Sequence, residues 1–144
     1  MSTFADTSAL VKIYADEPGD EYVRSLRGLM ISEISRVEVP AALWGKQRTG
    51  ALTAEQVRLL VNEFEADYRG TPESPARFSV VQVSTLVLEV AARLTGVHGL
   101  RAYDAVQLAT AQLVASTEPG CRSFAAFDKR LRDAAAAEGF QPVP

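Results

Sequence analysis

The chain has 144 residues, 47% of them hydrophobic and 23% charged, which is the composition of an ordinary globular protein and enough for one domain core. The net charge of −3 argues against broad, salt-driven binding to nucleic acid, and the single cysteine, Cys121, excludes an intramolecular disulfide and a thiolate metal cluster. No apolar run approaches the length of a membrane span and the first residues lack a signal-peptide pattern, so we expect a cytoplasmic protein without membrane association.

Short apolar runs alternate with longer helical patterns along the chain. In the first half we expect a strand at Thr3–Ala5, helices at Ser8–Asp16 and Glu21–Arg27, a strand at Leu29–Ser32, and helices at Glu33–Arg48 and Ala54–Tyr68. In the second half we expect a strand at Phe78–Val81, helices at Thr85–Val97 and Ala102–Ala115, a strand at Ser123–Phe127, a helix at Lys129–Ala137 and a short strand near Phe140–Val143. Apolar strands separated by helices predict a parallel sheet covered on both faces, a three-layer α/β domain.

Several of these helices carry start signals in the sequence. Ser32 stands before the third helix, Ser84 before the fifth, and Thr53 has Gln56 three residues further on, the spacing of a capping box. We expect all three hydroxyl residues to cap the helices that follow them.

Four of the eighteen acidic residues stand among small or apolar neighbours: Asp6, Glu38, Asp104 and Asp128. Each has an ordinary structural explanation when it is taken alone. Asp6 and Asp128 follow expected strands, where an aspartate commonly caps the next helix. Glu38 lies inside a helix and can pair with a nearby arginine, and Asp104 can pair with Arg101 in the same way.

Taken together, these four residues indicate a metal site. In open parallel sheets, ligands bind beyond the carboxyl ends of the strands, at the point where the strand order reverses. If the first and fourth strands are neighbours, Asp6 and Asp128 meet at that point, and helices that begin nearby bring Glu38 and Asp104 to the same place. Carboxylates that converge in this way need cations, and an all-oxygen ligand set favours Mg²⁺ or Mn²⁺ over zinc.

The segments around the four acids resemble the VapC toxins of the PIN-domain family. Four stretches are similar to the family's motifs: Phe4–Tyr14 with Asp16–Gly19, Ser32–Val39, Leu100–Ala109 and Phe127–Leu131. The resemblance covers nearly the whole chain, with the motifs in the right order. One departure is Ala126, because many members have Ser or Thr two residues before the fourth acid.

The resemblance implies one PIN domain over residues 1–144, with a short parallel sheet of order 3-2-1-4-5 flanked by helices in a Rossmann-like α/β/α arrangement. It implies a Mg²⁺- or Mn²⁺-dependent endoribonuclease in which a metal-activated water attacks the RNA phosphodiester. Asp6 and Asp104 would be the principal metal ligands, and Glu38 and Asp128 would complete the catalytic set. The implied biological role is the toxin of a toxin–antitoxin pair.

The resemblance also implies the partners of such a toxin. These are a second copy in a homodimer, an RNA substrate, and a VapB-type antitoxin whose C-terminal segment fills the active-site groove. DNA would be contacted only through the antitoxin.

Further site residues are expected around the acids. Thr7 and Ser8 can orient Asp6 or a bound water by hydrogen bonds. The cationic candidates for contacts with substrate phosphates are Arg101, Lys129, Arg130 and Arg132. These cations can equally well be ordinary charged side chains on the solvent-exposed faces of helices. Which carboxylate acts as general base, whether one or two metals take part and which RNA is cleaved are left open by the sequence.

Two other classes of function compete with this interpretation. A phosphatase of the haloacid-dehalogenase type needs a second aspartate two residues after the strand-end aspartate, and Ser8 occupies that position here. A non-catalytic protein that binds RNA or a partner would be favoured by loss of the acidic set, yet all four acids are present.

Overall fold

The computed structural model describes residues 2–144 and contains five strands and seven helices within that range. The strands are β1 (Thr3–Ala5), β2 (Leu29–Ser32), β3 (Ser79–Val81), β4 (Ser123–Ala125) and β5 (Gln141–Val143). The helices are α1 (Thr7–Tyr14), α2 (Asp20–Ser25), α3 (Ser35–Arg48), α4 (Ala54–Arg69), α5 (Thr85–His98), α6 (Ala102–Thr117) and α7 (Lys129–Ala137). The order of the elements is the one predicted from the sequence.

The strands form one parallel sheet in the order β3-β2-β1-β4-β5, which confirms the predicted fold class and topology. Strand β1 is central: Phe4 is in register with Met30 of β2 on one side and Phe124 of β4 on the other. The strand order therefore reverses between β1 and β4, and the residues that follow these two strands lie next to each other at the same edge of the sheet.

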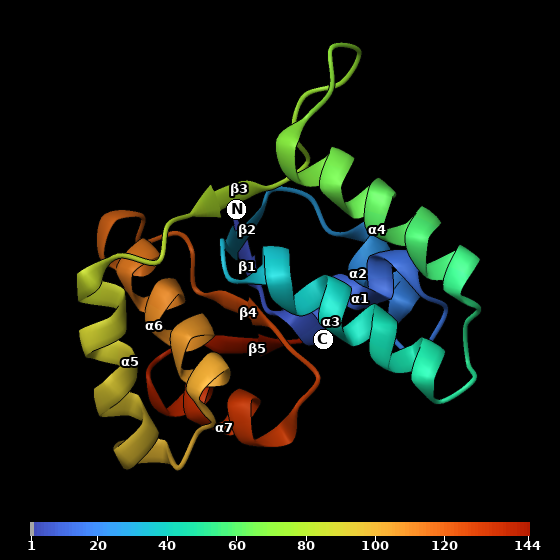
Figure 1. Ribbon diagram of the computed structural model, residues 1–144. Helices are drawn as coiled ribbons and strands as arrows, with labels where there is room; N and C mark the ends of the chain where they lie inside the picture. The colour runs from blue at the N-terminus through green and yellow to red at the C-terminus, as the bar shows by residue number, and fades with distance from the viewer. Residues whose placement is uncertain (1) are drawn as a thin grey trace.

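Helices cover both faces of the sheet, as Figure 1 shows. Side chains of α5, α6 and α7 pack with Phe4 and Phe124 in one apolar core, and side chains of α1 to α4 pack with Ala5 and Ile31 in a second core. The alternation of neighbouring residues such as Phe4 and Ala5 between the two cores follows from the two-residue period of a strand. In the described range, no helix has the length and apolar character needed to cross a membrane.

Helix starts agree with the predicted caps in two cases and differ in one. Thr53 and Gln56 form the reciprocal bonds of a capping box, and Ser84 accepts a hydrogen bond from the main chain one turn into α5. The prediction that Ser32 caps α3 is wrong, because Ser32 pairs with Val81 in the sheet and the helix begins only at Ser35. The ladder hydrogen bonds keep the chain extended through Ser32, which delays the start of the helix.

The fourth strand is also shorter than predicted, since β4 ends at Ala125 rather than at Phe127. The main-chain N–H of Phe127 donates to the Ser8 hydroxyl at 2.9 Å and so leaves the sheet. This bond joins the chain after β4 to the first turn of α1, at the edge where the two central strands end.

Candidate active site

Asp6 is the first residue after β1 and is almost completely buried, with 3% of its surface exposed. It caps α1 by accepting a hydrogen bond from the N–H of Ala9 at 3.0 Å, and its Oδ1 also accepts from the Ser8 hydroxyl at 2.7 Å. No lysine or arginine in residues 2–144 pairs with it. The pKa of this carboxyl is raised to about 7: burial is the largest cause, the two hydrogen bonds oppose the rise, and the negative charges of Asp104 and Glu38 add to it.

Asp128 begins α7 in the same way as Asp6 begins α1. Its Oδ2 accepts from the N–H of Leu131 at 3.0 Å, so it is a helix cap, as its ordinary explanation predicts. Unlike Asp6 it is exposed, and it stands at the rim of a hollow in the surface. Capping therefore fixes the carboxylate without removing it from contact with solvent.

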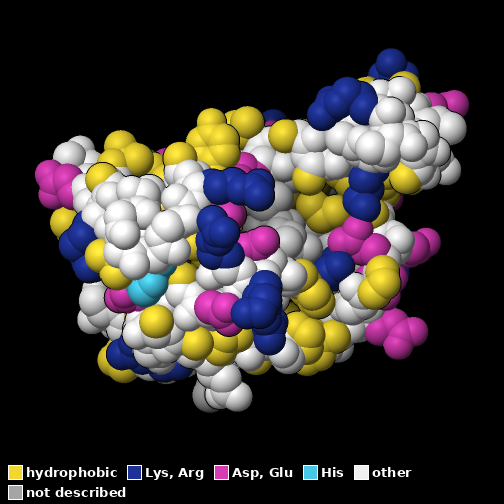
Figure 2. Space-filling model, turned by 90° about the horizontal axis from the view of Figure 1, so that it is seen from below, with side chains coloured by type: hydrophobic (Ala, Val, Ile, Leu, Met, Phe, Trp, Pro, Cys, Tyr) yellow, Lys and Arg dark blue, Asp and Glu magenta, His cyan; other side chains and the backbone are white. Residues whose placement is uncertain are grey.

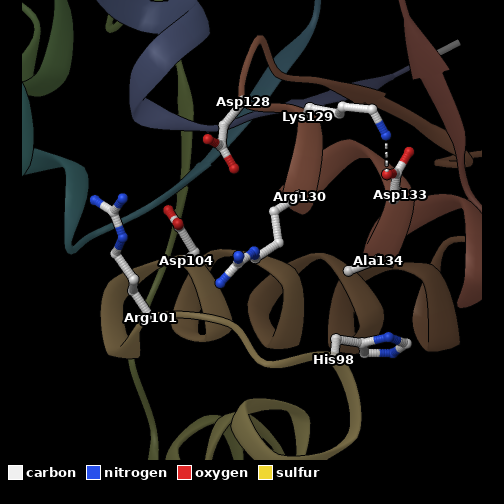
Figure 3. A pocket seen from close by; sticks show the side chains of 8 residues that line it. All are labelled: His98, Arg101, Asp104, Asp128, Lys129, Arg130, Asp133 and Ala134. Atoms are coloured by element: carbon white, nitrogen blue, oxygen red, sulfur yellow. Dashed lines mark hydrogen bonds and ion pairs between the residues drawn. The ribbon is translucent and has the colours of Figure 1, made fainter.

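Asp104 lies in the first turn of α6 and is partly buried. Burial raises the pKa of its carboxyl, the charges of Asp128 and Glu38 raise it further, and the charge of Arg101 opposes the shift. No direct ion pair joins Asp104 to Arg101 within the described chain. Figure 3 shows the carboxylates of Asp104 and Asp128 directed toward the same space between α6 and the start of α7.

Glu38 lies one turn into α3 and has neutral partners instead of the expected arginine. Its Oε1 accepts hydrogen bonds from the Thr7 hydroxyl at 2.9 Å and from the side-chain amide of Gln107 at 2.8 Å. Thr7 was expected to orient Asp6 or water, whereas its bond goes to Glu38; Ser8 does orient Asp6, as expected. Neutral donors hold the carboxylate without cancelling its charge.

The four acids thus come together at the edge where β1 and β4 end, close enough for their charges to act on one another. No three side chains of the Asp, Glu, His or Cys type in residues 2–144 form a preassembled cage for a metal ion. Magnesium is commonly held by only one or two carboxylates while it retains several waters, so it does not require such a cage. The all-oxygen donor set and the buried carboxyl of Asp6, which has no cation partner in residues 2–144, fit a hard divalent ion.

A surface hollow of about 600 Å³ opens at Asp104 and Asp128. Three of the predicted cations, Arg101, Lys129 and Arg130, line it (Figure 3). On the face drawn in Figure 2, Lys and Arg side chains stand beside acidic side chains across the middle of the molecule. A polyanion that approaches the acids would therefore meet positive charge at the rim.

The cations near the hollow differ in how firmly they are held. Lys129 pairs with Asp133 at 2.7 Å on an open surface, and Arg130 donates to the carbonyl oxygen of Gly99 at 3.1 Å. Arg132 does not line the hollow: its guanidinium donates to main-chain oxygens near the C-terminal strand, including that of Ala126 at 2.7 Å. These bonds favour a structural role for Arg132 over the phosphate contact for which it was a candidate.

Two features of this region are absent from the sequence-based prediction. The first is Gln107, a buried residue of α6 whose amide reaches Glu38. The second is a neighbouring hollow of about 620 Å³ that shares Asp128 with the first and contains Lys12 and Lys46, both paired with Glu17. The only sequence signal for Gln107 is its position one helical turn after Asp104 in an otherwise apolar stretch.

Comparison with known proteins identifies relatives along the whole chain. A family model for the PIN domain matches residues 3–137. Ribonuclease VapC45 and Ribonuclease VapC49, both from Mycobacterium tuberculosis, are each 30% identical to this chain, over 98% of this chain and 94% of their own length.

Solved structures with the same fold include three that cover most of the chain. FitAcB from Neisseria gonorrhoeae has a TM-score of 0.64 at 17% identity, covering 99% of this chain and 96% of its own. PAE2754 from Pyrobaculum aerophilum has a TM-score of 0.60 at 20% identity, with coverages of 99% and 92%. A toxin–antitoxin complex from Klebsiella pneumoniae has a TM-score of 0.56 at 17% identity, with coverages of 90% and 89%. At these identities the likeness shows the shared fold.

Proposed function

This chain belongs to the PIN-domain family, and we propose on that basis that it is a Mg²⁺- or Mn²⁺-dependent endoribonuclease and the toxin of a toxin–antitoxin pair. Two relatives over nearly its whole length are named ribonucleases. The observation that carries the proposal is the proximity of four acids, of which Asp104 and Asp128 line an open hollow while the charges of Asp6 and Glu38 act on Asp104 or on each other. The buried Asp6 carboxyl has no cation partner among residues 2–144.

Asp6 and Asp104 are the residues that would hold the divalent ion. The ion would supply a nucleophile at neutral pH and stabilise the negative charge that develops on the phosphate and the leaving oxygen. The raised pKa values of both carboxyls support this role, because a cation between them would relieve the cost of ionising two acids close together. Ser8 keeps Asp6 in one orientation through its hydrogen bond to Oδ1.

Glu38 is the better placed of the two remaining acids to take a proton from the attacking water. Thr7 and Gln107 both donate to its Oε1, and no hydrogen bond from residues 2–144 reaches its Oε2. One oxygen is thereby fixed while the other is available as an acceptor. Asp128, exposed at the rim and held as a helix cap, would orient the water or the substrate from the opposite side.

Phosphate contacts are proposed for the cations that line the hollow, Arg101, Lys129 and Arg130. Arg101 is the strongest candidate because its charge acts on Asp104 and no acid among residues 2–144 forms a direct ion pair with it. In-line attack at phosphorus with departure of the ribose oxygen leaves 5′-phosphate and 3′-hydroxyl ends. The relatives named ribonucleases favour RNA as the substrate, whose backbone would lie against these guanidinium and ammonium groups.

A homodimer held inactive by a VapB-type antitoxin in the cytoplasm is the assembly that we propose. One of the solved structures with this fold is described as a toxin–antitoxin complex, which supports an antitoxin partner for this chain. Contact with DNA would arise only through the antitoxin. Toxicity on expression that is rescued by the product of the neighbouring gene would test this role separately from the chemistry.

The chemistry is tested by cleavage of a structured RNA with Mg²⁺ or Mn²⁺, followed by chelation with EDTA. We expect cleavage to stop on chelation and to be lost in Asp6→Ala and Asp104→Ala. Asp16→Ala is a matched control, because the Asp16 side chain is 93% exposed and forms only a surface pair with Arg24. Cleavage that persists with EDTA, or in both site variants, would contradict the proposal.

A further inference from the structure

Gln107 is a fully buried polar side chain within the α6 face that packs on the sheet, with only 1% of its surface exposed. A buried amide is costly unless its hydrogen-bonding groups find partners, and here the nitrogen has acceptors in reach while Oε1 has no partner among residues 2–144. Its Nε2 lies 2.8 Å from Glu38 Oε1, 3.1 Å from Thr7 Oγ1 and 3.2 Å from Ser35 Oγ. A single amide group thus connects α6 with the first turns of α1 and α3.

The orientation of this amide is fixed by the charge of Glu38. A carboxylate only accepts hydrogen bonds, so the Gln107 nitrogen rather than its oxygen must face Oε1. Two N–H groups are shared among three acceptors, and the shortest of the three distances is the one to the carboxylate. The Thr7 hydroxyl, which accepts from Gln107, donates onward to the same Oε1 at 2.9 Å.

These bonds hold Glu38 in a way that a cation would not. An arginine or lysine at this place would pair with the carboxylate and cancel a negative charge that the site needs to attract a divalent ion. An amide fixes the position of one carboxylate oxygen and leaves the net charge unchanged. Gln107 also follows Asp104 by one helical turn, so the element that carries one proposed metal ligand also aligns the proposed base.

We propose that Gln107 is a positioning residue that aligns Glu38 for proton transfer. This inference rests on the proposed ribonuclease function. The hydrogen bonds of Gln107 to Glu38 and Thr7 restrict rotation of the carboxylate and present its second oxygen in a constant direction. Loss of the amide would leave Thr7 as the one described donor to Oε1 and widen the range of carboxylate orientations, which lowers the rate of the chemical step and leaves substrate binding largely intact.

The kinetic test compares Gln107→Met with Gln112→Met. Gln112 is a matched control on the same helix, because its side-chain amide also donates to a carboxylate, that of Glu138, away from the acids. We expect Gln107→Met to lower kcat by about 10- to 100-fold, with KM for RNA and the affinity for Mn²⁺ changed by less than about twofold. Gln112→Met should leave both kinetic constants unchanged. Equal kcat values for the two variants, or a loss that resides entirely in KM or in metal affinity, would overturn the inference.

A measurement on the metal-free protein separates this inference from the proposed function. In NMR spectra, a side-chain amide proton of Gln107 should resonate downfield because it donates to a charged carboxylate. It should move upfield in Glu38→Ala, while the signals of Gln112 stay in place. Absence of this shift would overturn the alignment of Glu38 by Gln107, even if RNA is cleaved. If the shift is present and the wild-type protein cleaves no RNA, the hydrogen bond stands and the ribonuclease proposal fails.

Discussion

Replacement of Asp6 by asparagine should stabilise the metal-free protein at neutral and alkaline pH. The carboxyl group is buried and has no cation partner in the described chain, so its ionisation opposes folding. Asparagine has nearly the same shape and is an equally good helix cap. Its amide oxygen can keep the hydrogen bonds from Ser8 and from the N–H of Ala9.

The magnitude follows from the pKa shift of Asp6. The pKa rises from 3.8 to about 7 in the folded protein, a difference of about 3 units, and each unit corresponds to about 1.4 kcal/mol. Below pH 3.8 the carboxyl is protonated in both states and imposes no penalty. As pH rises toward 7, the folded state binds more protons than the unfolded state, so stability falls and levels off above pH 7. The full penalty is about 4 kcal/mol, and burial of the new NH₂ group offsets part of the gain, which leaves about 2–4 kcal/mol.

Urea denaturation of the EDTA-treated proteins between pH 5 and 8 measures this effect. The stability of Asp6→Asn relative to the wild type should increase with pH across this range. Asp16→Asn, which alters a side chain that is 93% exposed, should show no comparable trend. A difference between Asp6→Asn and the wild type that is the same at pH 5 and pH 8 would refute the reasoning. Addition of Mg²⁺ should stabilise the wild type and not Asp6→Asn, because only the wild type retains both proposed ligands.

Three further predictions concern the surroundings of the site. Arg132→Ala should lower the free energy of unfolding, measured in urea, by about 1–3 kcal/mol, because the guanidinium donates to three main-chain oxygens. It should leave kcat unchanged at a temperature where the protein is folded, and a selective rise in KM for RNA would contradict this. Gly19→Ala should destabilise by about 1–3 kcal/mol in the same assay, since its φ is +93° and a Cβ atom would lie 2.6 Å from the Phe127 ring; an unchanged midpoint would contradict it. Arg101→Gln should raise the pKa of Asp104 further and move the acid limb of the pH profile of kcat/KM to higher pH. An acid limb at the same pH as in the wild type would contradict an effect of the Arg101 charge on Asp104.

The order of helices and strands is predictable from the sequence because apolar periodicity depends on residues close together along the chain. The boundaries depend on contacts between distant segments. Ser32 has the character of a helix cap, yet sheet pairing with Val81 keeps it extended. Phe127 has the character of a strand residue, yet its bond to Ser8, 119 positions away, takes it out of the sheet. Neither contact leaves a local signal.

The candidate site is partly predictable for the same reason. Asp6 and Asp128 are identified by position, because each follows a strand whose end lies at the edge where the order reverses. The partners of Glu38 are not predictable, because Thr7 and Gln107 lie 31 and 69 positions away from it. The sequence alone does not distinguish a glutamine whose amide holds a catalytic carboxylate from one that is buried in an apolar helix without such a partner.

The position of bound Mn²⁺ in the folded protein is the most direct test of the acidic site. Paramagnetic broadening in NMR spectra at substoichiometric Mn²⁺ identifies the nearest main-chain amides. The signals lost first should belong to residues beside Asp6, Glu38, Asp104 and Asp128. Broadening centred on exposed acids such as Asp16, with those four segments unaffected, would contradict the account.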